Sequence, residues 1–267
     1  MAKYKKKRAR ELQHDRFRDT TMSFFDRLGD LLEGRGRTIL YGLGGLLLAG
    51  LLVVLFFQWN NRKTDEARQA LGRAITISNA PIIATPVAGS SELTFSSEKE
   101  RAQRAIDEFE KVAAKYGEPY RSESRFFIAS NRLALDRQKG MSELAELGNS
   151  NVAEIAPLSK FALAQAQESD GKLQEAAQLY SDLAMLNSVI VTPETANLRL
   201  AKVYEKLGKK KEAADLLFNI VDASRKAKGA DNFPLPTSAA AREAAEELKK
   251  LDPDRYAQLP EIPSLTG

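Results

Sequence analysis

The sequence contains no cysteine and one histidine, His14, in 267 residues. Without cysteine there can be no disulfide, no thiolate nucleophile and no cysteine-ligated metal. A lone histidine in the N-terminal segment cannot supply a catalytic triad or a histidine-ligated metal site to the rest of the chain. No glycine-rich phosphate loop is found, because Gly42, Gly44, Gly45 and Gly50 lie inside an apolar run. We therefore expect a protein that is not an enzyme and has no cofactor and no metal.

Long alternating runs of β-branched residues are also lacking, whereas the strong helix formers Leu, Ala, Glu, Lys and Gln are abundant. This composition predicts an all-α protein. The roughly 200 residues that follow the apolar run are enough for one compact domain.

A run of nineteen residues without a charge extends from Ile39 to Phe57. A helix of that length spans close to the roughly 30 Å of a bilayer core. Tyr41 and Trp59 lie near its two ends, where aromatic rings prefer the headgroup zone. The alternative is a buried helix of a globular core, which usually carries some polar residues. Because the run is longer than the apolar part of a signal peptide and no small-residue cleavage site follows, we predict a transmembrane anchor over 39–59.

Charge predicts the orientation of this anchor. Residues 1–38 carry a net charge of +5, whereas the remainder of the chain carries −1. The positive-inside rule places the N-terminus in the cytoplasm and residues 60–267 across the membrane. We expect the basic tail, with an amphipathic helix around Phe24–Leu32, to meet anionic lipid headgroups. Ribosomal RNA or an acidic protein is the alternative for the tail, and no nucleic-acid binding is expected of the main domain.

Five segments are expected: a basic cytoplasmic tail, the transmembrane helix, a helical extension with a linker, a helical domain, and a proline-containing tail. Their bounds are 1–38, 39–59, 60–96, 97–251 and 252–267. Within the helical domain, a capping box at Ser97–Glu100 predicts the first helix. Further helices are predicted over 120–139, 141–148, 155–169, 172–187, 193–207, 209–226 and 237–251. Gly140 is expected to separate the first two of these, and Pro260 and Pro263 argue against a continued helix in the tail.

Two segments of the helical domain, 161–183 and 198–220, align with a period of 37 residues. The alignment pairs four positions: Leu163 with Leu200, Ala164 with Ala201, Gly171 with Gly208, and Ala176 with Ala213. Tyr180 and Tyr204 add aromatic positions, and each unit is helix, glycine turn, helix. These units resemble tetratricopeptide repeats, in which such residues interlock two helices. An earlier, degenerate unit has partial matches at Ala105, Phe109 and Gly140. The alternative is an irregular helical bundle.

The layout of the whole chain resembles the ancillary subunit of the bacterial SecYEG translocon, a single-span inner-membrane protein with a periplasmic tetratricopeptide-repeat-like domain. The segments that carry this resemblance are the basic tail, the span ending at Trp59, the Ala-rich helix around Ala67–Ala70 and the repeats. The resemblance implies a chaperone-linked role in protein translocation, with translocon subunits, periplasmic chaperones or client polypeptides as protein partners. The longer tail and the 78–96 insertion depart from that pattern. The alternative is a scaffold or assembly factor for cell-envelope or cell-division complexes.

Candidate partner-binding residues follow from the first helix of each repeat, which lines the concave surface of such a stack. In one unit these are Phe161 and Gln165. In the next they are Arg199, Lys202 and Lys206, which share a helix face and could pair with acidic side chains or a terminal carboxylate. An ordinary solvated face is the alternative. In the span, Gly45 and Ala49 form a small-xxx-small pair that could contact a partner helix.

Overall fold

A computed structural model describes residues 36–83, 93–230 and 233–261, with the backbone alone for residues 36–40, 60 and 61. The chain divides into two compact units, Met1–Glu66 and Ala67–Gly267. The predicted amphipathic helix of the basic tail, His14, the middle of the 78–96 insertion and Pro263 lie outside the described residues.

The described part of the first unit belongs to one helix, α2 (Gly36–Ser78), which continues into the second unit. Every side chain from Tyr41 to Trp59 is exposed. At the end of this stretch, the Lys63 ammonium lies 3.6 Å from the centroid of the Trp59 ring. Among the described residues, α2 is the one helix that is long and apolar enough to cross a membrane.

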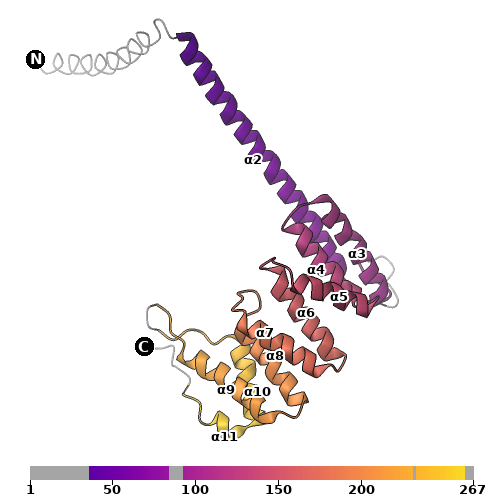
Figure 1. Cartoon of the computed structure of the whole chain (residues 1–267), viewed down its shortest axis with the longest axis vertical. Coiled ribbons are helices and arrows are strands. Elements are labelled where there is room, and N and C mark those ends of the chain that lie inside the picture. The colour runs from indigo at the N-terminus through magenta and orange to yellow at the C-terminus, as the bar shows by residue number, and fades with distance from the viewer. Residues whose placement is uncertain (1–35, 84–92, 231–232, 262–267) are drawn as a thin grey trace, which may run out of the picture. The chain divides into compact units, whose positions relative to one another are not determined.

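The second unit is a stack of helices in which each helix packs against the next one along the chain (Figure 1). The helices that follow α2 are α3 (Glu98–Lys115), α4 (Tyr120–Arg132), α5 (Arg137–Gly148), α6 (Ile155–Ser169), α7 (Leu173–Met185), α8 (Pro193–Lys206), α9 (Lys210–Lys226), α10 (Ala239–Leu251) and α11 (Pro253–Tyr256). Over the described ranges, extended backbone pairs only at two isolated bridges, Ile82 with Phe95 and Lys228 with Pro234. The predicted all-α fold of stacked helical hairpins is confirmed.

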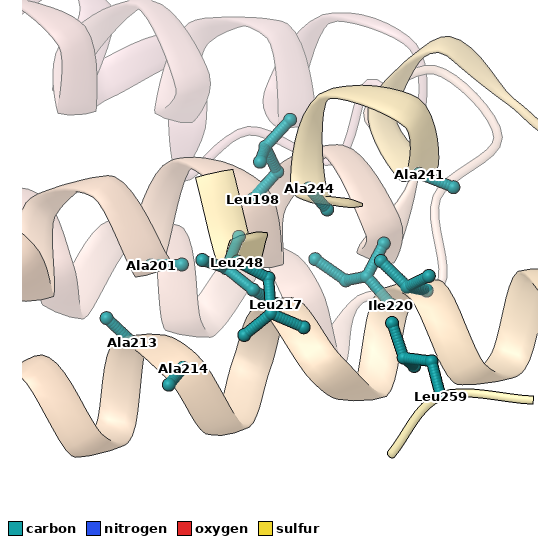
Figure 2. Packing of buried hydrophobic residues seen from close by; sticks show 11 residues of the cluster. Leu198, Ala201, Ala213, Ala214, Leu217, Ile220, Ala241, Ala244, Leu248 and Leu259 are labelled. Carbon is teal, nitrogen blue, oxygen red and sulfur yellow. The ribbon is translucent and has the colours of Figure 1, made fainter. Parts of the chain in front are cut away.

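The core is divided into four clusters of buried apolar side chains, each shared mainly by successive helices of the stack. The first joins the end of α2 to α3 and α4, and the last joins α8, α9 and α10 with Leu259 (Figure 2). This arrangement is typical of repeat proteins, where each unit is stabilised chiefly by its neighbours.

The two aligned units fold alike. Gly171 and Gly208 adopt left-handed backbone with φ of 73° and 76°. In both turns the glycine N–H and the following N–H donate to the preceding helix: Lys172 N to Gln167 O at 2.9 Å, and Lys209 N to Tyr204 O at 2.9 Å. This is a Schellman motif, which favours glycine because a Cβ is strained at positive φ. The aligned alanines, Ala164, Ala176, Ala201 and Ala213, are all buried.

The prediction that Gly140 separates two helices is wrong. Helix α4 ends at Arg132, and Gly140 is buried inside α5, which begins after Asp136 accepts a hydrogen bond from Lys139 N. A Cβ on Gly140 would lie 2.8 Å from the backbone nitrogen of Leu133. The glycine is therefore a point of close approach between two backbones rather than a break.

One smaller prediction also needs correction, and one short helix was not predicted. Ser97 caps α3 by accepting from Glu100 N, as expected, but the Glu100 carboxylate accepts from Ser96 N at 3.1 Å instead of from the cap residue. The short helix α11 was not predicted; Asp252 caps it by accepting from Arg255 N at 3.0 Å.

Candidate functional site

Helices α4, α6, α8 and α10 form one layer of the stack. Besides packing on their sequence neighbours, α4 contacts α6 and α8 contacts α10. In a superhelix, alternate helices approach each other on the concave side, so we name the surface of α4, α6, α8 and α10 the inner face. The predicted partner-binding residues of α6 and α8 lie on these helices.

A groove of about 730 Å³ lies on this layer. Phe126, Phe127, Ser130 and Asn131 of α4 line one side, and Ala162, Gln165, Ala166 and Ser169 of α6 line another; Ser78, Asn79, Glu98, Arg101, Ala102, Leu133, Ala134 and Arg137 complete it. We call it the α4–α6 groove. Its lining combines aromatic and small apolar side chains with amides, hydroxyls and the charged residues Glu98, Arg101 and Arg137.

Two polar side chains of the α4–α6 groove already form hydrogen bonds or an ion pair within the protein. The Asn131 amide donates to Phe127 O at 2.8 Å and its oxygen lies 3.1 Å from the Ser78 hydroxyl. Arg137 is held by Asp170, the Ser169 hydroxyl and Ala166 O.

Two atoms at the groove remain unsatisfied. The Ser130 hydroxyl and Arg101 Nε are buried and have no hydrogen-bond partner in the described part of the chain. Gln165 is exposed at the same groove. Both atoms have almost no exposed surface, so a ligand in the groove would contact the exposed Gln165 amide rather than these two atoms.

The basic residues of α8 are largely neutralised from neighbouring helices. Lys202 pairs with Glu243 of α10, and Lys206 pairs with Glu168 of α6. Glu168 also accepts a hydrogen bond of 3.1 Å from the Tyr180 hydroxyl of α7. These contacts tie α6, α7, α8 and α10 together.

Arg199 lies among these ion pairs but forms none with the described residues. Its charge affects the pKa values of two neighbouring groups, Tyr180 and Glu243. Burial, together with Glu168, raises the pKa of Tyr180, and Arg199 opposes that shift. The hydrogen bond from Lys202 lowers the pKa of Glu243, and the charges of Lys202 and Arg199 add to this effect. Of the three predicted cations on α8, Arg199 is thus the one open to an external anion within the described part of the chain.

Phe161 is half-buried and meets the ring of Tyr180 edge-on, with 5.7 Å between centroids and 65° between planes. It therefore contributes to packing between α6 and α7, and only part of its ring can meet a ligand. On α2, a Cβ on Gly45 would meet no atom within 4 Å, and Ala49 is exposed. No other part of the described chain therefore covers the small-xxx-small pair.

Sequence reasoning placed Gln165 on this face but missed Arg101, Ser130 and Asn131. The run Phe126–Leu135 contains a usable signal, because three consecutive polar residues, Ser130 to Arg132, interrupt an otherwise apolar stretch in the middle of a predicted helix. The described residues contain no group of three or more His, Cys, Asp or Glu that could hold a metal ion.

Comparison with known proteins adds little beyond the fold. No protein-family model matches the chain, and no curated protein matches it significantly. Two solved structures are similar: a kinesin light chain of Podosopora anserina with nearly identical TPR-like repeats, and a variant of that protein with one substitution. Each is 18% identical, covers 72% of this chain and 88% of its own, and superposes with a TM-score of 0.48. The class of the fold therefore rests on this chain's own turns and packing, which are those of a tetratricopeptide-like helical-repeat protein.

Proposed function

We propose that the protein is a membrane-anchored protein-interaction module of the bacterial cytoplasmic (inner) membrane. In this proposal the N-terminus is cytoplasmic, and the repeat unit lies in the periplasm and assists the translocation of secreted proteins, or their hand-over to chaperones, at the Sec translocon. The observation that carries it is the apolar, wholly exposed stretch of α2 in a chain that also contains a stack of interaction repeats.

The hydrophobic effect supports the anchor. Each Å² of apolar surface left in water is unfavourable by roughly 25 cal/mol, and the nineteen successive residues from Tyr41 to Trp59 are all exposed in the structure. The Lys63–Trp59 pair adds the combination of aromatic ring and cation that suits the headgroup zone. The positive charge of residues 1–38 supports a cytoplasmic N-terminus near anionic lipid.

The inner face supports polypeptide binding. The α4–α6 groove offers aromatic surface and the exposed amide of Gln165, which together fit a main chain with side chains of mixed character. Arg199 could hold an acidic side chain or a terminal carboxylate. Lys202 and Lys206 would contribute only where the ligand displaces Glu243 or Glu168. We therefore assign the leading roles to Gln165 and Arg199, and secondary ones to Phe161, Lys202 and Lys206.

A second candidate function is a rigid scaffold for cell-envelope or cell-division complexes. The ion pairs of Lys202 and Lys206 favour it, because they bridge separate hairpins and resist sliding of one repeat past another. In that case the same ion pairs would remain closed when the partner binds.

The test is photocrosslinking in intact membranes from the full-length chain, with the photoreactive residue at Gln165. Lys211, exposed on α9, is the matched control position. Translocon subunits and nascent secreted chains captured from Gln165 and not from Lys211 support the first function. Capture of envelope-assembly proteins alone supports the scaffold. Capture of cytosolic proteins alone contradicts both.

A second experiment addresses the span. Replacing Ile39–Phe57 with an unrelated apolar span keeps the anchor but removes Gly45 and Ala49. If these residues contact a partner helix, the swapped protein loses copurification with the translocon while its membrane location and abundance are unchanged. Full copurification of the swapped protein would mean that the span acts only as a tether.

A further inference from the structure

The connection between α7 and α8 exposes apolar side chains that nothing in the described chain covers. Val189 is 88% exposed and Met185 is 70% exposed, and Leu186 and Ile190 are each more than two-fifths exposed. We call these four residues the 185–190 ridge. Met185 is the last residue of α7, and the other three follow it in the connection.

The ridge has a defined conformation. Asn187 adopts left-handed backbone with φ of 48°, and the Ser188 hydroxyl accepts from the backbone nitrogens of Ile190 and Val191, at 3.1 and 3.4 Å. Val191 is buried in the cluster shared by α6, α7 and α8. The chain is thus held at its base while Val189 and Ile190 point away from the core.

A groove of about 740 Å³ runs between the ridge and the connection of α5 to α6. The side chains of Asn149, Asn151 and Asn187 line it and form no hydrogen bond with the described residues. Of the described residues in its lining, Glu154 and Lys160 alone carry charge, and the two charges are opposite. The site therefore combines the apolar side chains of the ridge with three asparagine amides, and its two charged residues have opposite charges.

We propose that the ridge and this groove bind an extended, uncharged, apolar segment of a non-native polypeptide. Successive side chains of an extended chain point to opposite sides, so alternate apolar residues can contact the ridge while the main chain pairs with the asparagine amides. The inference rests on the proposed function in one respect: a module beside a translocon meets chains that have not yet folded.

Two other occupants fit less well. Four side chains, two of them about half buried, are few for a stable dimer interface, which takes roughly 800 Å² and roughly 20–30 residues from each partner. A lipid surface would place the amides of Asn149, Asn151 and Asn187 against hydrocarbon, where unpaired polar groups are unfavourable. A short peptide segment satisfies both the apolar ridge and the amides.

The absence of cysteine allows a direct test on the full-length chain in detergent micelles, because Val189→Cys introduces a single thiol for an environment-sensitive fluorophore. The probe is a nine-residue peptide in which leucine and valine alternate with serine. The matched peptide has aspartate in place of leucine, and the matched protein carries the label at Lys211→Cys. We expect saturable fluorescence change only for the apolar peptide and only with the label at position 189.

A competition measurement tests the ridge without a label. Val189→Asp should weaken binding of the apolar peptide at least about tenfold, since a buried charge is strongly unfavourable. Leu235→Asp, at an exposed apolar residue in another connection, should leave it unchanged.

Several results would overturn the proposal. The first is an equal fluorescence change with both peptides. The second is an equal loss of peptide binding in Val189→Asp and Leu235→Asp. The third is no fluorescence change with either peptide. A change on raising the protein concentration alone would identify a second copy as the occupant, and a change on adding phosphatidylcholine vesicles alone would identify lipid. If the peptide does not bind the ridge, the crosslinks from Gln165 can still support the proposed function. If the crosslinks fail, peptide binding at the ridge can still be observed. The two experiments therefore test the two proposals separately.

Discussion

Replacing Ala213 with leucine tests the repeat alignment through the sign of its effect on stability. Ala213 is fully buried and shares a cluster with Ala201 and Ala214, from the two helices of one hairpin (Figure 2). If the cluster had free space, three more buried carbons would stabilise the fold by about 2 kcal/mol. If the helices meet as closely as the alignment implies, the larger side chain overpacks them and destabilises by about 1–3 kcal/mol.

The measurement is urea unfolding of residues 60–267, followed by far-ultraviolet circular dichroism. An unchanged urea dependence of the free energy would show that the loss lies in the native state. In a thermal scan, each kcal/mol lowers the midpoint by about 2–4 °C for a domain of this size.

Controls come from the same helices. Ala223→Leu, at an exposed position of α9, should change the free energy by less than about 0.5 kcal/mol. Ala176→Leu, at the equivalent buried position of the preceding repeat, should behave like Ala213→Leu. Stabilisation by Ala213→Leu, or the same effect at Ala223, would refute close packing at the aligned alanines.

Three further predictions follow from the turns, the ion pairs and the anchor. Gly208→Ala should destabilise the same fragment by about 1 kcal/mol in urea unfolding, because alanine is strained at φ 76° although its Cβ would meet no atom within 4 Å. The lowered pKa of Glu243 implies stability that is present above the unfolded value near 4.5 and is lost as pH falls through the folded value. Lys202→Met should flatten that part of the curve of free energy against pH, and an unchanged curve would contradict the assignment. Finally, a periplasm-dependent reporter fused after Trp59 should be active, and activity of a cytoplasm-dependent reporter there would reverse the orientation.

Local patterns predicted those features of the fold that depend on residues close together in sequence. The turn glycines and buried alanines recur at a fixed period, because each hairpin repeats the same contacts between two adjacent helices. Helix α8 begins at Pro193 as expected, since Thr192 accepts from Thr195 N and proline suits the first turn.

Features that depend on distant segments were not predicted. Gly140 resembles a helix break in sequence, and only the backbone of Leu133 beside it shows why the residue must lack a Cβ. Helix periodicity placed Lys202 and Lys206 on one face, but it carries no information on Glu243 and Glu168, which are 41 and 38 residues away. Their pairing decides how much of that face is available to a ligand.

These ion pairs separate two regions of the inner face. On α8, an acidic ligand must compete with carboxylates already in place, so its net gain is small unless it reaches Arg199. At the α4–α6 groove, a ligand can contact the exposed Gln165 amide and the rings of Phe126 and Phe127 without displacing the ion pairs of α8. Binding should therefore depend more on the α4–α6 groove than on Lys202 and Lys206, which are already paired. Raising the salt concentration should then weaken ligand binding only slightly, because the interactions that contribute most are hydrogen bonds and apolar contacts rather than exposed charge pairs.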